Sequence, residues 1–315
     1  MVTQEIIPGV YYLQGKFARE FGFISTYIIV DNEQALVIDP GTAGAPGEQI
    51  PDALKKIGLK PKSDVIGIVC THGHPDHIGG VSRLCRLTSA PVMIHKNDIE
   101  MLESPEMFIK KRLRMDFAKR FAMKFDKSPL RVNYGPVSPE RKLNDNDTIK
   151  VGNRSLSVLH TGGHSTGHII LHEHSSNLCF SGDELNNFPN DARKFYVDLS
   201  GSLTNKLSAV EKLLKLNIEY LLPAHDVFHV GRDAQLQLRE VQAGIIHFQD
   251  TILSLLSARD EADIDQLVLD IDRSRSVPFP VLMDSLLPTT VEVALRSLQL
   301  AGLVSTDDGT LWFKV

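Results

Sequence analysis

A dense run of side chains that can bind a metal ion follows an apolar segment near residue 70. The run is His72-Gly73-His74-Pro75-Asp76-His77, with three imidazoles and one carboxylate. Gly73 and Pro75 permit a tightly coiled path, so these groups can converge. Imidazole and carboxylate donors without a thiolate suit zinc, iron or manganese, whereas the all-oxygen sites typical of magnesium and calcium are excluded. The run therefore predicts a metal site rather than a solvated loop.

Three further candidate ligands lie downstream, each just after a short apolar segment. They are His164, Asp183 and His225. A catalytic metal ion typically needs three protein ligands and one open position, and the first loop already offers four groups. The complete set is therefore large enough for two metal ions. In α/β folds such sites gather beyond the carboxyl ends of strands, which is where each candidate falls.

Short strands alternating with helices must position these residues. Apolar runs predict strands at residues 10–13, 26–30, 35–38, 65–70, 91–95, 148–151, 156–159, 168–171, 178–180 and 220–223, and helices at 48–57, 79–87 and 204–216. After about residue 232 we expect a long helix over 233–256, helices over roughly 262–272, 278–286 and 289–301, and a hairpin around 307–309. This order suggests a winged-helix appendage. The expected domains are a catalytic domain over 1–232, with a helical insertion at about 98–131, and a C-terminal helical domain over 233–315.

The composition is that of an ordinary globular chain. It has 315 residues, of which 42% are hydrophobic and 23% charged, enough for one large domain or two ordinary ones. No stretch approaches the roughly 18 apolar residues of a membrane span, and the N-terminus shows no secretory signal pattern. Three cysteines without paired spacing argue against a disulfide scaffold. These features predict a cytoplasmic protein, and the formal net charge of −5 disfavours a general nucleic-acid binder.

Residues 107–131 differ sharply in charge, with nine basic and two acidic side chains and hence a formal charge of +7. Apolar residues recur there every four positions, which predicts a basic amphipathic helix with a Met/Phe face. One interpretation is a cap that binds an amphiphilic anion, such as an acyl thioester of a phosphorylated carrier. The cap residues would be Lys110, Lys111, Arg112, Arg114, Phe117 and Phe121. The alternatives are a helix packed on the domain or between subunits with solvated charges, and a weak membrane-surface contact.

The motifs, taken in order, resemble the metallo-β-lactamase superfamily, in particular its glyoxalase II-like members with a dinuclear site. The matching segments, within residues 6–230, are Ala35–Gly41, Thr71–His77, His164, Asp183 and His225. Two small departures, Gly162 where the family often has proline and Ala224 where it often has glycine, touch no ligand. The C-terminal section is similar to the winged-helix extension on one branch of these hydrolases.

The resemblance implies an αββα sandwich with the metal site at one edge of two packed sheets. It also implies two divalent ions per chain, with zinc expected and iron or manganese as alternatives. The first ion would be held by His72, His74 and His164, the second by Asp76, His77 and His225, with Asp183 bridging them.

This ligand set favours hydrolysis. Two neighbouring cations lower the pKa of a shared water molecule toward neutrality, and the hydroxide formed attacks a carbonyl or phosphoryl centre. Redox diiron relatives tend to carry a carboxylate where this chain has His74, but a mononuclear-iron persulfide-type oxygenase shares much of the set and stays an alternative. Lactonases of this fold usually carry a tyrosine three residues beyond the bridging aspartate, where this chain has Asn186.

Other residues near the motifs have expected supporting roles. We expect Asp76 to shuttle a proton as well as bind metal. Asp39 would either orient a histidine or its loop, or serve only the structure of the turn. His168 and Asn186 are candidates for contact with the ligands or the substrate.

Three functional hypotheses follow. The first is hydrolysis of an ester or thioester of a small, anionic or amphiphilic substrate. The second is a metal-dependent phosphodiesterase or ribonuclease, and the third a non-catalytic effector-binding module. Residues 261–315 carry four basic and nine acidic side chains, opposite to what phosphate contacts need, so we expect this tail to serve packing or homodimerisation.

Overall fold

Each central strand of the protein is apolar on both faces, and this explains its layered architecture. The computed structural model describes residues 3–16, 23–114, 134–185, 196–274 and 283–315. In strand β4 (Gln34–Ile38), Leu36 and Ile38 pack in the core between two sheets, whereas Val37 packs in a second core beneath helices. In β10 (Ile169–Glu173), Ile169 and its neighbours divide in the same way between the inter-sheet core and a helical one. Such strands must be covered on both sides.

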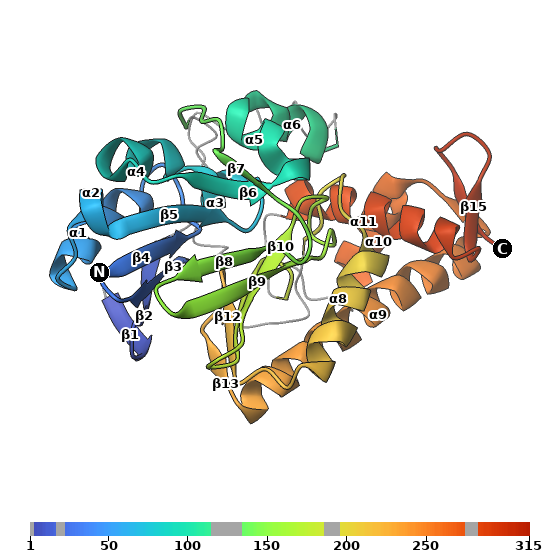
Figure 1. Cartoon of the computed structure of the whole chain (residues 1–315). Helices are drawn as coiled ribbons and strands as arrows, with labels where there is room; N and C mark the ends of the chain where they lie inside the picture. Colours follow the sequence, from blue (N-terminus) through green and yellow to red (C-terminus); the bar gives the residue numbers. More distant parts are fainter. Residues whose placement is uncertain (1–2, 17–22, 115–133, 186–195, 275–282) are drawn as a thin grey trace.

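The first sheet has seven strands that follow chain order. They are β1 (Thr3–Ile7), β2 (Val10–Lys16), β3 (Phe23–Asp31), β4, β5 (Val65–Cys70), β6 (Val92–His95) and β7 (Arg141–Leu143). β1 to β4 are antiparallel, and β4 to β7 are parallel. Helices α1 (Ile50–Lys56), α2 (Pro61–Asp64) and α4 (Val81–Thr88) cover its outer face (Figure 1).

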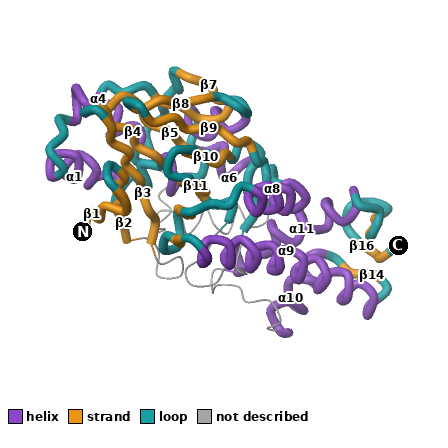
Figure 2. The backbone as a smooth tube through the Cα atoms, turned by 60° about the horizontal axis from the view of Figure 1, so that its bottom comes forward, coloured by secondary structure: helices purple, strands orange, loops and turns teal. Residues whose placement is uncertain are grey.

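The second sheet has six strands and packs against the first. They are β8 (Thr148–Val151), β9 (Arg154–His160), β10, β11 (Leu178–Gly182), β12 (Tyr220–Pro223) and β13 (His229–Val230). Helices α8 (Leu203–Lys215) and α9 (Arg232–Arg259) lie on its outer face, side by side (Figure 2). The predicted αββα sandwich is therefore confirmed.

The C-terminal part combines helices with a three-stranded sheet. Its elements are α10 (Ile264–Ser274), α11 (Met283–Leu300), β14 (Glu261–Ala262), β15 (Val304–Thr306) and β16 (Trp312–Lys314). The prediction of two helices over 278–286 and 289–301 was wrong, because α11 continues through Pro288. Its apolar face, which includes Leu287 and Val291, packs in the core shared with α8 and α9, and this packing outweighs the hydrogen bond that proline removes. The same core crosses the expected domain boundary at residue 232.

The insertion also differs from its prediction. It begins with η2 (Lys96–Asp98), α5 (Ile99–Glu103) and α6 (Glu106–Arg112), and the backbone is already extended at Leu113, which is fully buried. The expected continuous helix over 107–131 is therefore wrong at this point, since burial of Leu113 ends it. Phe117 and Phe121 lie outside the described residues.

Within the described ranges, no helix is long and apolar enough to span a membrane.

Candidate metal centre

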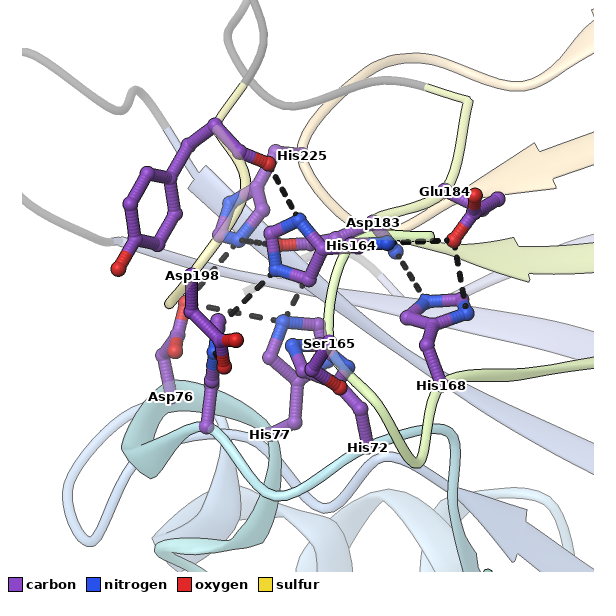
Figure 3. Close-up of polar contacts among 12 residues, drawn as sticks. His72, Asp76, His77, His164, Ser165, His168, Asp183, Glu184, Asp198 and His225 are labelled. Atoms are coloured by element: carbon purple, nitrogen blue, oxygen red, sulfur yellow. Dashed lines mark hydrogen bonds and ion pairs between the residues drawn. The ribbon is translucent and has the colours of Figure 1, made fainter. Parts of the chain in front are cut away.

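Seven buried side chains meet at one edge of the sandwich, each supplied by the segment that follows a strand (Figure 3). The loop after β5, which runs into the short helix α3 (Pro75–Ile78), carries four of them. The other three follow β9, β11 and β12. They are the predicted set: His72, His74, Asp76, His77, His164, Asp183 and His225, with exposed fractions between 0% and 6%.

The seven residues form two groups that share Asp183. One group is His72, His74, His164 and Asp183, and the other is Asp76, His77, Asp183 and His225, with the ligand atoms of each group within 4.8 Å of one another. In the first group, His164 Nε2 lies 3.1 Å from His74 Nδ1. In the second, His225 Nε2 lies 3.0 Å from Asp76 Oδ2. Asp183 reaches both, with Oδ2 3.6 Å from His164 Nε2 and Oδ1 3.3 Å from His77 Nε2.

Three of the inward-facing atoms lack a hydrogen-bond partner, and this fits ligands of a metal ion. His72 Nε2, His77 Nε2 and Asp183 Oδ1 are buried, yet within the described chain they make no hydrogen bond. Buried polar atoms are almost always paired, so unpaired ones need an explanation. A cation supplies the missing partner for nitrogen and carboxylate oxygen alike, and the donor set suits zinc, iron or manganese.

The outward-facing nitrogen of every histidine in the centre is held by an oxygen atom. The pairs are His72 Nδ1 with Thr71 Oγ1 (3.1 Å), His74 Nε2 with Asp198 Oδ2 (2.9 Å), His77 Nδ1 with Asp39 Oδ2 (2.9 Å), His164 Nδ1 with the Tyr196 carbonyl (2.6 Å) and His225 Nδ1 with the Phe23 carbonyl (2.9 Å). An acceptor on the far side fixes the proton there, so the inward nitrogen keeps its lone pair for a metal.

Asp39 supports ligands of both groups, as expected of an orienting residue. Besides His77, it accepts hydrogen bonds from the Thr71 backbone N–H and from Thr71 Oγ1, both at 2.7 Å. Because the Thr71 hydroxyl donates to Asp39, it is left to accept from His72. The Asp39 carboxylate thus orients the ring of His77 directly and the ring of His72 through the Thr71 hydroxyl.

The two groups differ electrostatically. Burial lowers the pKa of His72 and of His164 well below the ordinary value, and neighbouring imidazoles add to this. Burial acts the same way on His77 and His225, but nearby carboxylates, above all Asp183, outweigh it and raise the pKa of both. Burial would raise the pKa of Asp183, and the charges of His225 and His77 hold it well below its usual range instead. A metal ion bound at the second group would therefore compete with protons on His77 and His225, whereas His72 and His164 favour the neutral imidazole that a metal ion needs.

The backbone of Asp183 is held by a buried polar group. His168 Nε2 accepts its N–H (3.1 Å), and Lys206 Nζ donates to its carbonyl (3.0 Å). Glu184 accepts from the His164 N–H (3.0 Å), which ties the two ligand segments together. His168 and Lys206 are fully buried. His168 thus contacts the backbone of a candidate ligand, one of the two roles expected for it.

Four basic residues of the insertion fall within the described part of the chain, and three of them are ion-paired within the protein. Arg112 is buried and pairs with Asp98 and Asp198, so its assignment to a substrate-binding cap was wrong. Lys111 pairs with Glu100 at the surface, Arg114 lies 3.8 Å from Glu292, and Lys110 is exposed. Asn186 lies outside the described residues.

Sequence reasoning missed Asp198, Glu184 and Lys206. Nothing near Asp198 or Lys206 in the chain forms a pattern with the metal motif, so their types and spacing carry no signal. Glu184 directly follows Asp183, and that adjacency was the one available sign.

Comparison with known proteins agrees with this geometry. The family model described as metallo-beta-lactamase superfamily matches residues 19–225. The chain therefore belongs to the metallo-beta-lactamase superfamily. Acyl-coenzyme A thioesterase MBLAC2 of Gallus gallus is 27% identical over 256 residues, covering 76% of this chain and 86% of that protein. MBLAC2 of Homo sapiens is 27% identical over 288 residues, covering 86% and 95%. The chain is accordingly a hydrolase.

Solved structures agree in fold over nearly the whole chain. A metallo-beta-lactamase family protein from Thermus thermophilus superposes with a TM-score of 0.74 at 19% identity, covering 99% of this chain and 100% of that one. A beta-lactamase domain protein from Burkholderia ambifaria gives a TM-score of 0.75 at 19% identity, covering 99% and 93%. The C-terminal elements are thus part of a fold found in other proteins.

Proposed function

We propose that this protein is a metal-dependent thioesterase that uses two divalent cations to hydrolyse an acyl thioester, with acyl-coenzyme A as the substrate class. The observation that carries the proposal is the pair of buried ligand groups sharing Asp183, with unpaired atoms facing inward. Relatives named acyl-coenzyme A thioesterases support the choice of thioester over other bonds.

The ligand assignment follows the two groups. His72, His74 and His164 would hold one cation, Asp76, His77 and His225 the other, and Asp183 would contact both. Zinc suits this nitrogen-rich set best, with iron or manganese as the other candidates. Bound there, the cations would polarise the substrate carbonyl and lower the pKa of a shared water molecule toward neutrality.

The residues of the chain supply orientation and a proton acceptor. The five histidines are locked by their outward hydrogen bonds, so the ligand atoms stay aimed at the centre without rearrangement. Asp76 Oδ2 lies at the second group, 3.0 Å from His225 Nε2 and 3.7 Å from His77 Nε2. That placement suits Asp76 to accept a proton from attacking water and pass it to the leaving sulfur.

The role of Asp76 is tested with Asp76→Asn. If Asp76 carries the proton, the variant still binds metal but hydrolyses the thioester at least ~100-fold more slowly, within the usual range for general acid–base catalysis. Metal content and turnover are measured on the same preparation. Full metal loading with unchanged turnover would rule the role out.

The function is tested on protein purified without added metal. Its metal content is determined, and acyl-coenzyme A, lactone, phosphodiester, RNA and β-lactam substrates are assayed together. We expect thioester hydrolysis that is lost on chelation and restored by zinc, and that is absent in His225→Ala. Thioester hydrolysis that persists in metal-stripped protein, or cleavage of RNA without cleavage of thioesters, would contradict the proposal.

We further infer that residues 233–315 form a winged-helix-like unit that serves packing. Its helices and three-stranded sheet support this form, and the acidic balance of the tail argues against a nucleic-acid partner. Homodimerisation through this unit is a second prediction, tested by measuring the mass of the protein in solution.

A further inference from the structure

A buried cluster of charges lies directly behind His74. Its members are Asp98, Arg112 and Asp198, with exposed side-chain fractions of 1%, 4% and 0%. The Arg112 guanidinium lies 2.7 Å from Asp98 Oδ1 and 3.5 Å from Asp198 Oδ2. It also donates to Ser200 Oγ and to the carbonyl of Asn97. Its planar fork of donors suits several acceptors at once.

Asp98 contacts both loops that carry the histidines of the first group. Its Oδ2 accepts the backbone N–H of Gly73 (2.8 Å) and the hydroxyl of Ser165 (2.9 Å), which adjoin His74 and His164. A Cβ on Gly167 would come within 2.4 Å of the Asp98 carboxyl carbon, so a glycine is required there for this close approach. Asp98 therefore fixes the spacing of the two loops.

Asp198 connects the same cluster to the ligands themselves. Its carboxylate accepts from His74 Nε2 at 2.9 Å, and its backbone N–H donates to the carbonyl of His164 at 3.0 Å (Figure 3). Ser200 donates to Asp198 Oδ1 and accepts the N–H of Thr166, next to the His164 loop. None of these contacts involves a residue of the second metal group.

The position of Arg112 shows how the insertion reaches this cluster. Arg112 is the last residue of α6, and its carbonyl accepts the N–H of Leu199 at 3.0 Å. Burial acts to lower its pKa, but the carboxylates of Asp198 and Asp98 outweigh this and raise it. The guanidinium is therefore a permanent charge between two carboxylates that would otherwise repel each other in a buried space.

From these contacts we propose that Arg112 is a positioning residue for the metal position formed by His72, His74 and His164, acting through Asp198 and Asp98. The inference rests on the proposed metal centre but not on its substrate. The basic C-terminal end of α6 thus orients the metal ligands through two carboxylates and does not bind an anion. Residues that orient metal ligands typically change metal affinity by about 10- to 100-fold when replaced.

The test is a zinc titration of the metal-stripped full-length protein against a chromophoric chelator. His72→Ala and His225→Ala each remove one ligand, so they identify which zinc equivalent belongs to which group. We expect Arg112→Met to lower the zinc affinity of the position that includes His72 by about 10- to 100-fold. The zinc affinity of the position that includes His225 should stay within threefold of the wild-type value. Cobalt substitution should show an altered absorption spectrum for the same equivalent alone.

A second variant covers the case that Arg112→Met fails to fold. Asp198→Asn removes the negative charge that accepts from His74, and the remaining charges of Arg112 and Asp98 still balance. The variant should lower the affinity for the same zinc equivalent and not for the other. Arg259→Met, which breaks a remote arginine–aspartate pair with Asp270, is the matched control and should leave both equivalents unchanged. If Asp198→Asn lowers the zinc affinity of both positions equally, or of neither, the proposal is overturned. A wild-type protein that binds zinc but leaves thioesters intact would refute the proposed substrate only.

Discussion

Replacing Asp39 by asparagine tests whether the support of the metal ligands is as specific as the structure indicates. The carboxylate accepts three hydrogen bonds, at 2.7, 2.7 and 2.9 Å, from Thr71 and His77. An asparagine of the same shape has one acceptor oxygen, and its NH₂ group must face at least one of these donors. A hydrogen bond to a charged group contributes about 1.5–3 kcal/mol.

This energy can be compared with the expected change in metal binding. A 10- to 100-fold loss of affinity, typical when an orienting partner is removed, corresponds to about 1.4–2.8 kcal/mol. The two ranges are similar, so the loss of one such bond is large enough to account for a weakening of metal binding of this size. Because Asp39 contacts His77 directly and His72 only through Thr71, the His77 group should lose more affinity than the His72 group.

The assay is the same competition titration, together with thioester turnover at low and at raised zinc concentration. We expect turnover of Asp39→Asn to recover in part as zinc is raised, since the defect is in binding. Asp31→Asn is the control, because Asp31 accepts a bond from the Asn153 N–H far from the centre. Zinc affinities within twofold of wild type in both groups would refute the reasoning.

Three further predictions concern stability. Gly163→Ala places a Cβ 1.9 Å from Glu184 Oε1 and 2.6 Å from the Lys206 Cα, so it should cost about 1–3 kcal/mol in denaturant unfolding, and an unchanged unfolding free energy would contradict this packing. Removing metal should lower the melting temperature, because a ligand at 100 times its dissociation constant stabilises by about 2.7 kcal/mol; an unchanged melting temperature would contradict metal binding by the folded state. Burial, and then repulsion from the charged form of the neighbouring His160, lower the pKa of His95 to about 4, so the unfolded chain takes up a proton first as pH falls below 6.5. Stability should thus decline between pH 6.5 and 4, and His95→Phe should reduce that decline in acid titrations, whereas His174→Gln at the surface should not.

The sequence was most informative where residue type and chain position together carry the chemistry. The seven candidate ligands could be picked out because histidines and aspartates follow apolar runs, and the ends of strands from the two packed sheets meet at one edge of the sandwich. The central strands β4, β5 and β10 were predictable because they are apolar on both faces, whereas the short or edge strands β1, β7, β13 and β14 were not predicted. Fold class and candidate centre could therefore be derived before any coordinates.

The supporting residues could not be found in this way. Asp198 meets His74 across 124 positions of the chain, and no local pattern marks such a partner. Arg112 fits a solvated helix face equally well by its spacing, and only the fold brings Asp98 and Asp198 to it. The expected break between residues 286 and 289 does not occur in α11, because local propensity takes no account of the core against which Leu287 and Val291 pack.

The apolar core that joins α9 to the second sheet has a practical consequence for anyone shortening this protein. A fragment cut after residue 232 would retain every residue of the metal centre, yet the core around Ile170, Cys179 and Leu221 would lose α9 and keep only α8 as a cover. Exposed strand faces of this kind invite aggregation. A shortened version of the enzyme must therefore keep the helix that covers the second sheet, although the last residue of the metal centre is His225.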